Sequence, residues 1–150
     1  MWRRTSGSLP RSTLRRFQSR FGGLILAQAA HSLEEYVGRL WETFAPARLV
    51  SRLISDNLEL GFLIANFFLV GFGLWCWIVP VRRGWAGAVP LAWVWVTIEL
   101  INGIGHPLWS FRQGHYTPGT LTAPLLLVLA IYLARQLRRP EVQHNAPPQR

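Results

Sequence analysis

The chain has 150 residues, of which 50% are hydrophobic and only 15% charged, with 8 tryptophans and a net charge of +9. This length fits one domain, and the composition is too apolar and aromatic for an ordinary soluble protein, so it indicates an integral membrane protein. All 16 basic residues are arginines, most of them beside apolar segments, and no nucleic-acid-binding motif accompanies them. We therefore expect membrane lipids, and not nucleic acid, as their partner.

Residues 1–20 form a basic segment that contains arginine, serine and threonine but no acidic residue. We interpret this segment as a disordered cytoplasmic tail that sets the orientation in the membrane. Two alternatives share its composition. One is a transit peptide, and the other is a secretory signal with Ala27-Gln28-Ala29 as its cleavage site.

Residues 21–44 are expected to form the first membrane-spanning helix. Its apolar pattern is interrupted by polar residues at helical spacing, which therefore share one face: Gln28, His31, Glu34 and Glu35. Ionisable groups that face lipid carry a high free-energy cost, so this face must contact other helices. The segment from His31 to Glu35 is the centre of the candidate site.

Two further helices are predicted in the next part of the chain. Residues 46–56 alternate apolar and polar side chains at helical spacing, which is typical of a short helix lying on the membrane surface. Residues 57–80 are long and apolar enough to cross a bilayer core, which takes about 20 residues. Glu59 and Asn66 are the polar members of this second span, and they share one face.

The third predicted span covers residues 85–105. Its second half carries Glu99, Asn102 and His106 on one face. Pro107 disfavours helical geometry at the residue before it, so we expect the helix to end there.

The last part of the chain holds a loop, a span and a tail. Residues 109–117 are expected to form a polar loop that contains His115 and Tyr116. Residues 120–137 form the fourth predicted span, and residues 138–150 a disordered tail.

Four spans place both termini on one side of the membrane. The arginines concentrate in the two terminal regions and in the Arg82–Arg83 turn, so the positive-inside rule places both termini in the cytoplasm. The absence of lysine is typical of a GC-rich bacterial genome, so we expect a bacterial inner membrane. The predicted fold is all-α, an up-and-down four-helix membrane bundle over residues 21–137 with a short interfacial helix between the first two spans.

The up-and-down order also predicts where the polar groups meet. At about 1.5 Å of rise per residue, the polar residues of the first three spans fall at overlapping depths in one half of the bundle. Polar residues scattered at random would not share one half, so we expect a common polar pocket there.

Imidazole and carboxylate groups at one depth are metal ligands. His31 and Glu35 are four residues apart and can reach one ion, with Glu34 as the base that handles protons. His106 and Glu99 would complete the ligand set. Two histidines with several carboxylates favour a divalent ion such as iron or manganese, with zinc as a third choice, and two ions are an alternative.

The remaining polar residues are assigned supporting roles. We expect five of them to hold ligands or substrate by hydrogen bonds: Glu59, Asn66, Asn102, His115 and Tyr116. Two readings without a metal stay open. In the first, the histidines and glutamates only form pairs that lock the bundle, and in the second they form a ligand-binding or proton-relay site.

Several of these residues form an ordered combination within the four spans: His31, Glu34, Glu35, Asn66, Asn102, His106 and the Tyr116-x-Pro118-Gly119 turn. In this combination, the chain resembles the HXXEE-domain family of small membrane proteins over about residues 22–135. The resemblance implies a membrane setting and a role for these residues, but it names neither a reaction nor an oligomeric state.

Taken together, these patterns predict a membrane-embedded metal site. The activity that suits it best is metal-assisted oxidation or hydrolysis of a lipid or another apolar molecule that arrives through the bilayer. The rival interpretation is a non-enzymatic membrane protein that binds a small ligand or partner.

Overall fold

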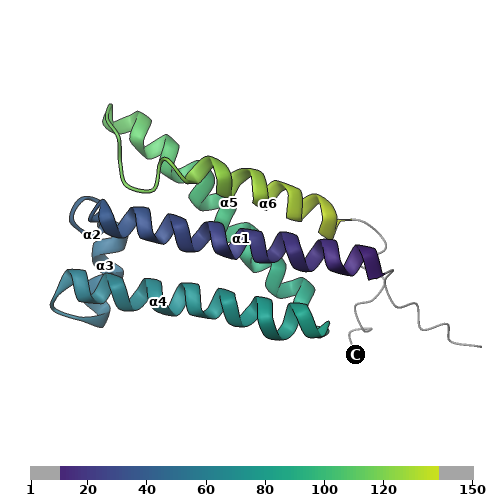
Figure 1. The fold of residues 1–150 in the computed structure, drawn as a ribbon. Coiled ribbons are helices and arrows are strands. Elements are labelled where there is room, and N and C mark those ends of the chain that lie inside the picture. Colours follow the sequence, from purple (N-terminus) through teal and green to yellow (C-terminus); the bar gives the residue numbers. More distant parts are fainter. Residues whose placement is uncertain (1–10, 139–150) are drawn as a thin grey trace, which may run out of the picture.

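The computed structural model describes residues 11–138, which form helices and contain no strand (Figure 1). The all-α class expected from the sequence is therefore confirmed. The elements in chain order are α1 (Arg11–Val37), α2 (Leu40–Thr43), α3 (Ala45–Ile54), α4 (Leu58–Cys76), the π-helical segment η1 (Trp77–Val81), α5 (Ala88–Gln113) and α6 (Ala123–Leu137).

The four long helices pack into one bundle. α1 lies between α4 and α6, and α5 packs mainly along α6 (Figure 1). The short helices α2 and α3 lie at the end of the bundle where α1 ends and α4 begins, with α3 packed against α4. One end of the bundle is therefore covered by short helices, while the other holds the start of α1 and the end of α6.

Two apolar clusters stabilise the bundle. The larger one joins the first half of α1 to η1, α5 and α6, and is centred on Phe21, Leu24 and Trp95, which are fully buried. The smaller one lies near α2 and contains Leu40, Trp41 and Phe62. Along α1 and α5, the buried polar side chains come between these two clusters, so apolar packing holds the polar region from both ends.

Helix α1 begins ten residues earlier than expected. The prediction of a disordered tail over residues 1–20 is wrong for residues 11–20, which are helical, while residues 1–10 lie outside the described residues. The reason is tertiary packing: Phe17 is buried in the larger cluster, and Arg20 Nη1 donates to Gln136 Oε1 of α6 at 3.2 Å. Arginine is also a good helix former.

Helix α5 continues where an end was expected. It runs through Pro107 to Gln113, so the predicted helix end at residue 106 and the predicted loop over residues 109–117 are wrong for residues up to 113. The preference of a residue before proline for extended geometry is weak enough for packing to override it, and neighbouring helices make such prolines tolerable. Here Trp109 packs on Phe44, with 4.7 Å between the ring centroids, which supports the turn after Pro107.

The second predicted span is confirmed as a helix by α4 and η1 together. The short helix predicted over residues 46–56 is confirmed as α3, which ends at Ile54, whereas the first predicted span divides at Gly38 into α1 and α2. Within the part of the chain that the structure describes, two helical segments are long and apolar enough to cross a membrane, Leu58–Val81 and Ala88–Gln113, and α6 is a shorter apolar helix. Residues 139–150 of the expected tail over residues 138–150 lie outside the described residues.

The contact between α5 and α6 depends on the small size of Gly103. A Cβ at this position would lie 2.7–2.9 Å from the Cβ and backbone of Leu127, so we expect Gly103→Ala to destabilise the protein by about 1–3 kcal/mol. Gly105→Ala is the matched control, because a Cβ there meets no atom within 4 Å and alanine is the better helix former. When thermal unfolding is measured in detergent, the midpoint temperature should be lower than that of the wild type only for Gly103→Ala. Equal shifts of the midpoint in the two variants would contradict this account.

Candidate metal centre

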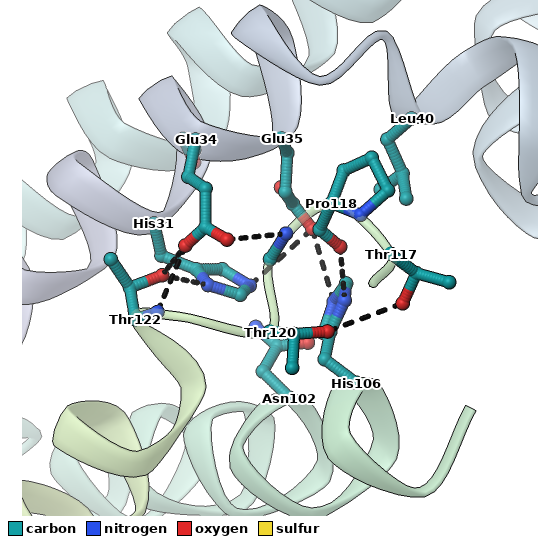
Figure 2. A network of polar contacts seen from close by, with 12 residues as sticks. His31, Glu34, Glu35, Leu40, Asn102, His106, Thr117, Pro118, Thr120 and Thr122 are labelled. Atoms are coloured by element: carbon teal, nitrogen blue, oxygen red, sulfur yellow. Dashed lines mark hydrogen bonds and ion pairs between the residues drawn. The ribbon is translucent and has the colours of Figure 1, made fainter. Parts of the chain in front are cut away.

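Three side chains converge in the buried polar region: His31 and Glu35 from α1 and His106 from α5 (Figure 2). Glu35 Oε1 lies 3.4 Å from His31 Nε2 and 3.2 Å from His106 Nε2. The possible ligand atoms of all three residues lie within 4.8 Å of one another, and all three residues are buried. These residues are called the His–Glu–His group below.

The hydrogen bonds of Thr122 determine which nitrogen of His31 carries a proton. The Thr122 hydroxyl donates to Glu34 Oε2 at 2.5 Å, so its proton is not available to the imidazole. His31 Nδ1 lies 2.7 Å from the hydroxyl oxygen of Thr122 and must therefore be the donor in this contact. In a neutral imidazole this leaves Nε2 as a free lone pair, and Nε2 is a buried atom without a hydrogen-bond partner among the described residues.

His106 is oriented in the same way by a backbone carbonyl. Its Nδ1 lies 2.8 Å from the oxygen of Pro118, which can only accept, so Nδ1 carries a proton, and in a neutral imidazole Nε2 is a free lone pair. With both imidazoles neutral, the two Nε2 lone pairs and a carboxylate oxygen of Glu35 face one another with no hydrogen between them. Three electron-rich atoms in this arrangement repel each other unless a cation lies among them.

Two of the three distances among these atoms fit a metal ion. Atoms that each lie about 2.0–2.1 Å from one tetrahedral zinc ion are about 3.3 Å apart, close to the two distances from Glu35. Imidazole nitrogen and carboxylate oxygen are ligands of zinc, iron and manganese. The His–Glu–His group can therefore hold a divalent ion. A proton on either Nε2 would instead produce an ion pair with Glu35, which is the structural alternative.

Glu34 lies beside His31 but is not one of the three ligand residues, and its carboxylate binds the turn that precedes α6 (Figure 2). Its carboxylate accepts hydrogen bonds from the backbone N–H groups of Gly119, Leu121 and Thr122 at 2.9–3.0 Å. The hydroxyls of Thr122 and Tyr116 donate to it as well. A carboxylate that already accepts five hydrogen bonds has little capacity left for a further proton, so this position does not favour the predicted role of Glu34 as a base.

The turn at residues 117–122 supports both imidazoles, because it provides Pro118 to His106 and Thr122 to His31. Hydroxyl contacts of 2.6 Å from Ser110 to Thr117 and to Thr120 brace it against α5. The sequence reasoning missed Thr122, Thr117, Thr120 and Ser110 as site residues. The only signal for them was a cluster of hydroxyl residues around the Pro118-Gly119 turn, which is common in turns of every kind.

Tyr116 lies in the loop after α5 and donates its hydroxyl to Glu34 Oε1 at 2.7 Å. Loss of water around the hydroxyl and the nearby carboxylate raise the pKa of Tyr116 to about 12, so the hydroxyl remains protonated at neutral pH. Tyr116 therefore acts as a permanent donor to Glu34.

Glu99 is fully buried but does not belong to the His–Glu–His group, where it had been expected as a ligand. One orientation of the Gln28 amide gives all of its polar neighbours a hydrogen-bond partner. In this orientation the NH₂ group donates to the two oxygens of Glu99 at 2.8 and 3.0 Å, and the carbonyl oxygen accepts from the Ser32 hydroxyl. Asn102 Nδ2 lies 3.4 Å from Glu99 Oε2. Glu99 thus forms a separate amide–carboxyl cluster beside the group.

The other predicted site residues do not belong to the His–Glu–His group. Glu59 accepts a hydrogen bond of 2.8 Å from the exposed hydroxyl of Tyr36. His115 contacts the carbonyl of its neighbour Tyr116 and is exposed. Asn66 donates to the carbonyl of Phe62 within α4. Neither Glu59 nor His115 is brought to the His–Glu–His group.

A pocket of about 390 Å³ adjoins the group between α3, α4 and α5, and is called the lateral pocket below. Glu35 and His106 line it, whereas His31 does not. Asn66 and Asn102 are further polar lining residues, and most of the others are apolar. An ion held by the His–Glu–His group would therefore be reached from the lateral pocket.

Comparison with known proteins gives one match. A family model described as "protein of unknown function with HXXEE motif" matches residues 23–133. No curated protein and no solved structure matches the chain. The matched segment contains all three residues of the His–Glu–His group as well as Glu34 and the turn that it binds.

Proposed function

Since the chain belongs to the HXXEE family, whose function is unknown, we propose that it is an integral membrane protein that binds one divalent metal ion through His31, Glu35 and His106. The observation that carries this proposal is the convergence of two imidazole Nε2 atoms on one carboxylate oxygen. The buried Nε2 atom of His31, which has no hydrogen-bond partner among the described residues, adds to it.

The donor set narrows the identity of the ion. Two histidines and one carboxylate with open positions are the ligands of non-haem Fe(II) enzymes, and the same donor types hold catalytic zinc. Three protein ligands leave room for water or substrate, as catalytic sites require and closed structural sites do not. We therefore propose iron, manganese or zinc as the ion.

The exposed surface supports a membrane setting. Only 17% of the most apolar part of Leu58–Val81 and 33% of that of Ala88–Gln113 is buried, whereas the core helix of a soluble protein would be mostly buried. Large apolar side chains such as Phe67, Phe68 and Ile101 are exposed along these helices. We propose that α1 and α6 cross the bilayer with them, giving four spans with α3 at the interface and both termini in the cytoplasm.

The proposed activity is metal-assisted oxidation or hydrolysis of a lipid or another apolar molecule. A bound ion would supply Lewis acidity or redox chemistry at the wall of the lateral pocket. Pro118 and Thr122 hold the two imidazoles with their lone pairs toward the ion. The surrounding apolar side chains exclude water, which strengthens the electrostatic interactions of the site.

The test is elemental analysis of the detergent-purified protein, prepared without chelator, by plasma mass spectrometry. We expect one equivalent of a transition metal in the wild type and a fall in metal affinity of roughly 100-fold or more in Glu35→Gln, because a ligand is lost. Glu42→Gln is the control, since Glu42 pairs only with the exposed Arg39.

A wild-type protein without stoichiometric metal would overturn the proposal. The contacts of Glu35 with His31 and His106 would then be ion pairs of protonated imidazoles, and the non-enzymatic alternative would stand. In that case Glu35→Gln should lower thermal stability without changing metal content.

A further inference from the structure

We propose that the lateral pocket binds one single-chain amphiphile, a long hydrocarbon chain that ends in a hydroxyl or carbonyl group. This inference rests on the proposed metal site, because the polar end of the molecule would lie beside the ion. It names the class of substrate that the site would take.

The size of the pocket argues for a single chain. Its volume of about 390 Å³ falls in the range of small-molecule sites. At roughly 30 Å³ for a group the size of a methylene, the pocket holds about a dozen carbon atoms. This is sufficient for most of one chain, but a phospholipid with two chains does not fit.

The polar lining argues for a neutral end group that can donate a hydrogen bond. The NH₂ group of Asn66 donates to the carbonyl of Phe62, and that of Asn102 donates to the Glu99 carboxyl group. Neither carboxamide oxygen accepts a hydrogen bond within residues 11–138. These oxygens are available to a hydroxyl. Among residues 11–138, no arginine lines the pocket and Glu35 is its only carboxylate, so a phosphate group would find no side-chain cation there.

The position of the pocket matches the way an amphiphile lies in a bilayer. Its exposed lining residues Pro46 and Val50 belong to α3, so it opens beside this helix. α3 also exposes the apolar Leu49 and Leu53, as expected of a helix at the membrane interface.

The other end of the pocket is apolar and lies deeper along the helices. Leu69 lies almost one turn beyond Asn66 on α4, and Ile98 about one turn before Asn102 on α5. A chain that enters beside α3 can therefore extend toward the bilayer centre while its polar end stays near Glu35 and His106.

The experiment uses a hexadecanol probe with a diazirine in its chain, added to the full-length protein in detergent with its metal content measured. After illumination, mass spectrometry maps the labelled residues. We expect labelling of α3 and α4 around the pocket. Hexadecanol should compete about tenfold better than hexadecane, because only the alcohol can form the hydrogen bond.

Two variants block the pocket from two of its helices, Ala65→Trp on α4 and Val50→Trp on α3. Their matched controls, Leu63→Trp and Leu53→Trp, place the same side chain on the same helices outside the pocket. We expect the blocking variants to lose most of the labelling while retaining metal, and the controls to keep both. Retained metal shows that a blocked variant is still folded.

The other possible results of this experiment distinguish failure of the amphiphile proposal from failure of the metal proposal. Labelling spread over the lipid-facing surface in all variants, or equal competition by hexadecane, would overturn the amphiphile inference while leaving the metal site intact. Pocket labelling in a wild-type protein that holds no metal would overturn the metal proposal and keep the pocket as a ligand site.

Discussion

Replacement of Glu34 by alanine is expected to lower the free energy of unfolding by about 3–5 kcal/mol and the metal affinity by about 10–100-fold. Five donors lose their acceptor at once, and the N–H groups of Gly119 and Thr122 are among the partly buried ones. The turn at residues 117–122 then no longer holds Pro118 and Thr122 against the two imidazoles.

The measurement combines thermal unfolding in detergent with metal titration. Glu34→Gln should fall between wild type and alanine, because the amide oxygen still accepts while its NH₂ group faces backbone donors. Glu42→Ala serves as the control, since an exposed ion pair contributes little. If Glu34→Ala lost metal-dependent activity but kept full stability and affinity, Glu34 would be a base and the present account would be wrong.

Gly119→Ala is expected to disrupt the same site by a steric mechanism. Gly119 has φ +92°, a conformation that residues with a side chain rarely adopt. A Cβ there would collide with His106 Nδ1 and would lie 2.6 Å from His106 Cε1 and 2.9 Å from His31 Cε1. Both imidazoles would have to move. We therefore expect the free energy of unfolding to fall by about 3 kcal/mol or more and tight metal binding to be lost.

Gly114→Ala isolates the backbone contribution. Gly114 also has a positive φ, +71°, but a Cβ there meets no atom within 4 Å. Gly114→Ala should therefore lower the free energy of unfolding by only about 1 kcal/mol and leave metal binding unchanged. Cobalt(II) substitution gives an absorption spectrum that reports ligand geometry, and it should change for Gly119→Ala alone. Identical effects of the two variants would show that the imidazoles do not depend on the turn.

The two adjacent glutamates have different tasks because of helix geometry. Successive residues on a helix project about 100° apart. Glu35 consequently faces His31 and His106, while Glu34 faces the turn before α6. The spacing in the sequence places both within one turn of His31, but it does not distinguish a ligand from an anchor.

The sequence by itself determined the features that depend on neighbours along the chain. Apolar length identified α4 with η1 as a helix, because a bilayer core requires about 20 apolar residues. Helical periodicity placed His31 and Glu35 on one face, and the order of the spans indicated that His106 lies at their depth. These inferences succeed because bond geometry repeats every 3.6 residues in any helix.

Tertiary structure alone decided the rest. Packing of Phe17 extended α1 to Arg11, and packing of Trp109 carried α5 past Pro107. The acceptor that orients His31 is the hydroxyl oxygen of Thr122, which lies 91 positions away in the chain. No local pattern encodes such a contact, because it forms only when α1 and α6 pack and the turn between α5 and α6 comes to lie against both histidines.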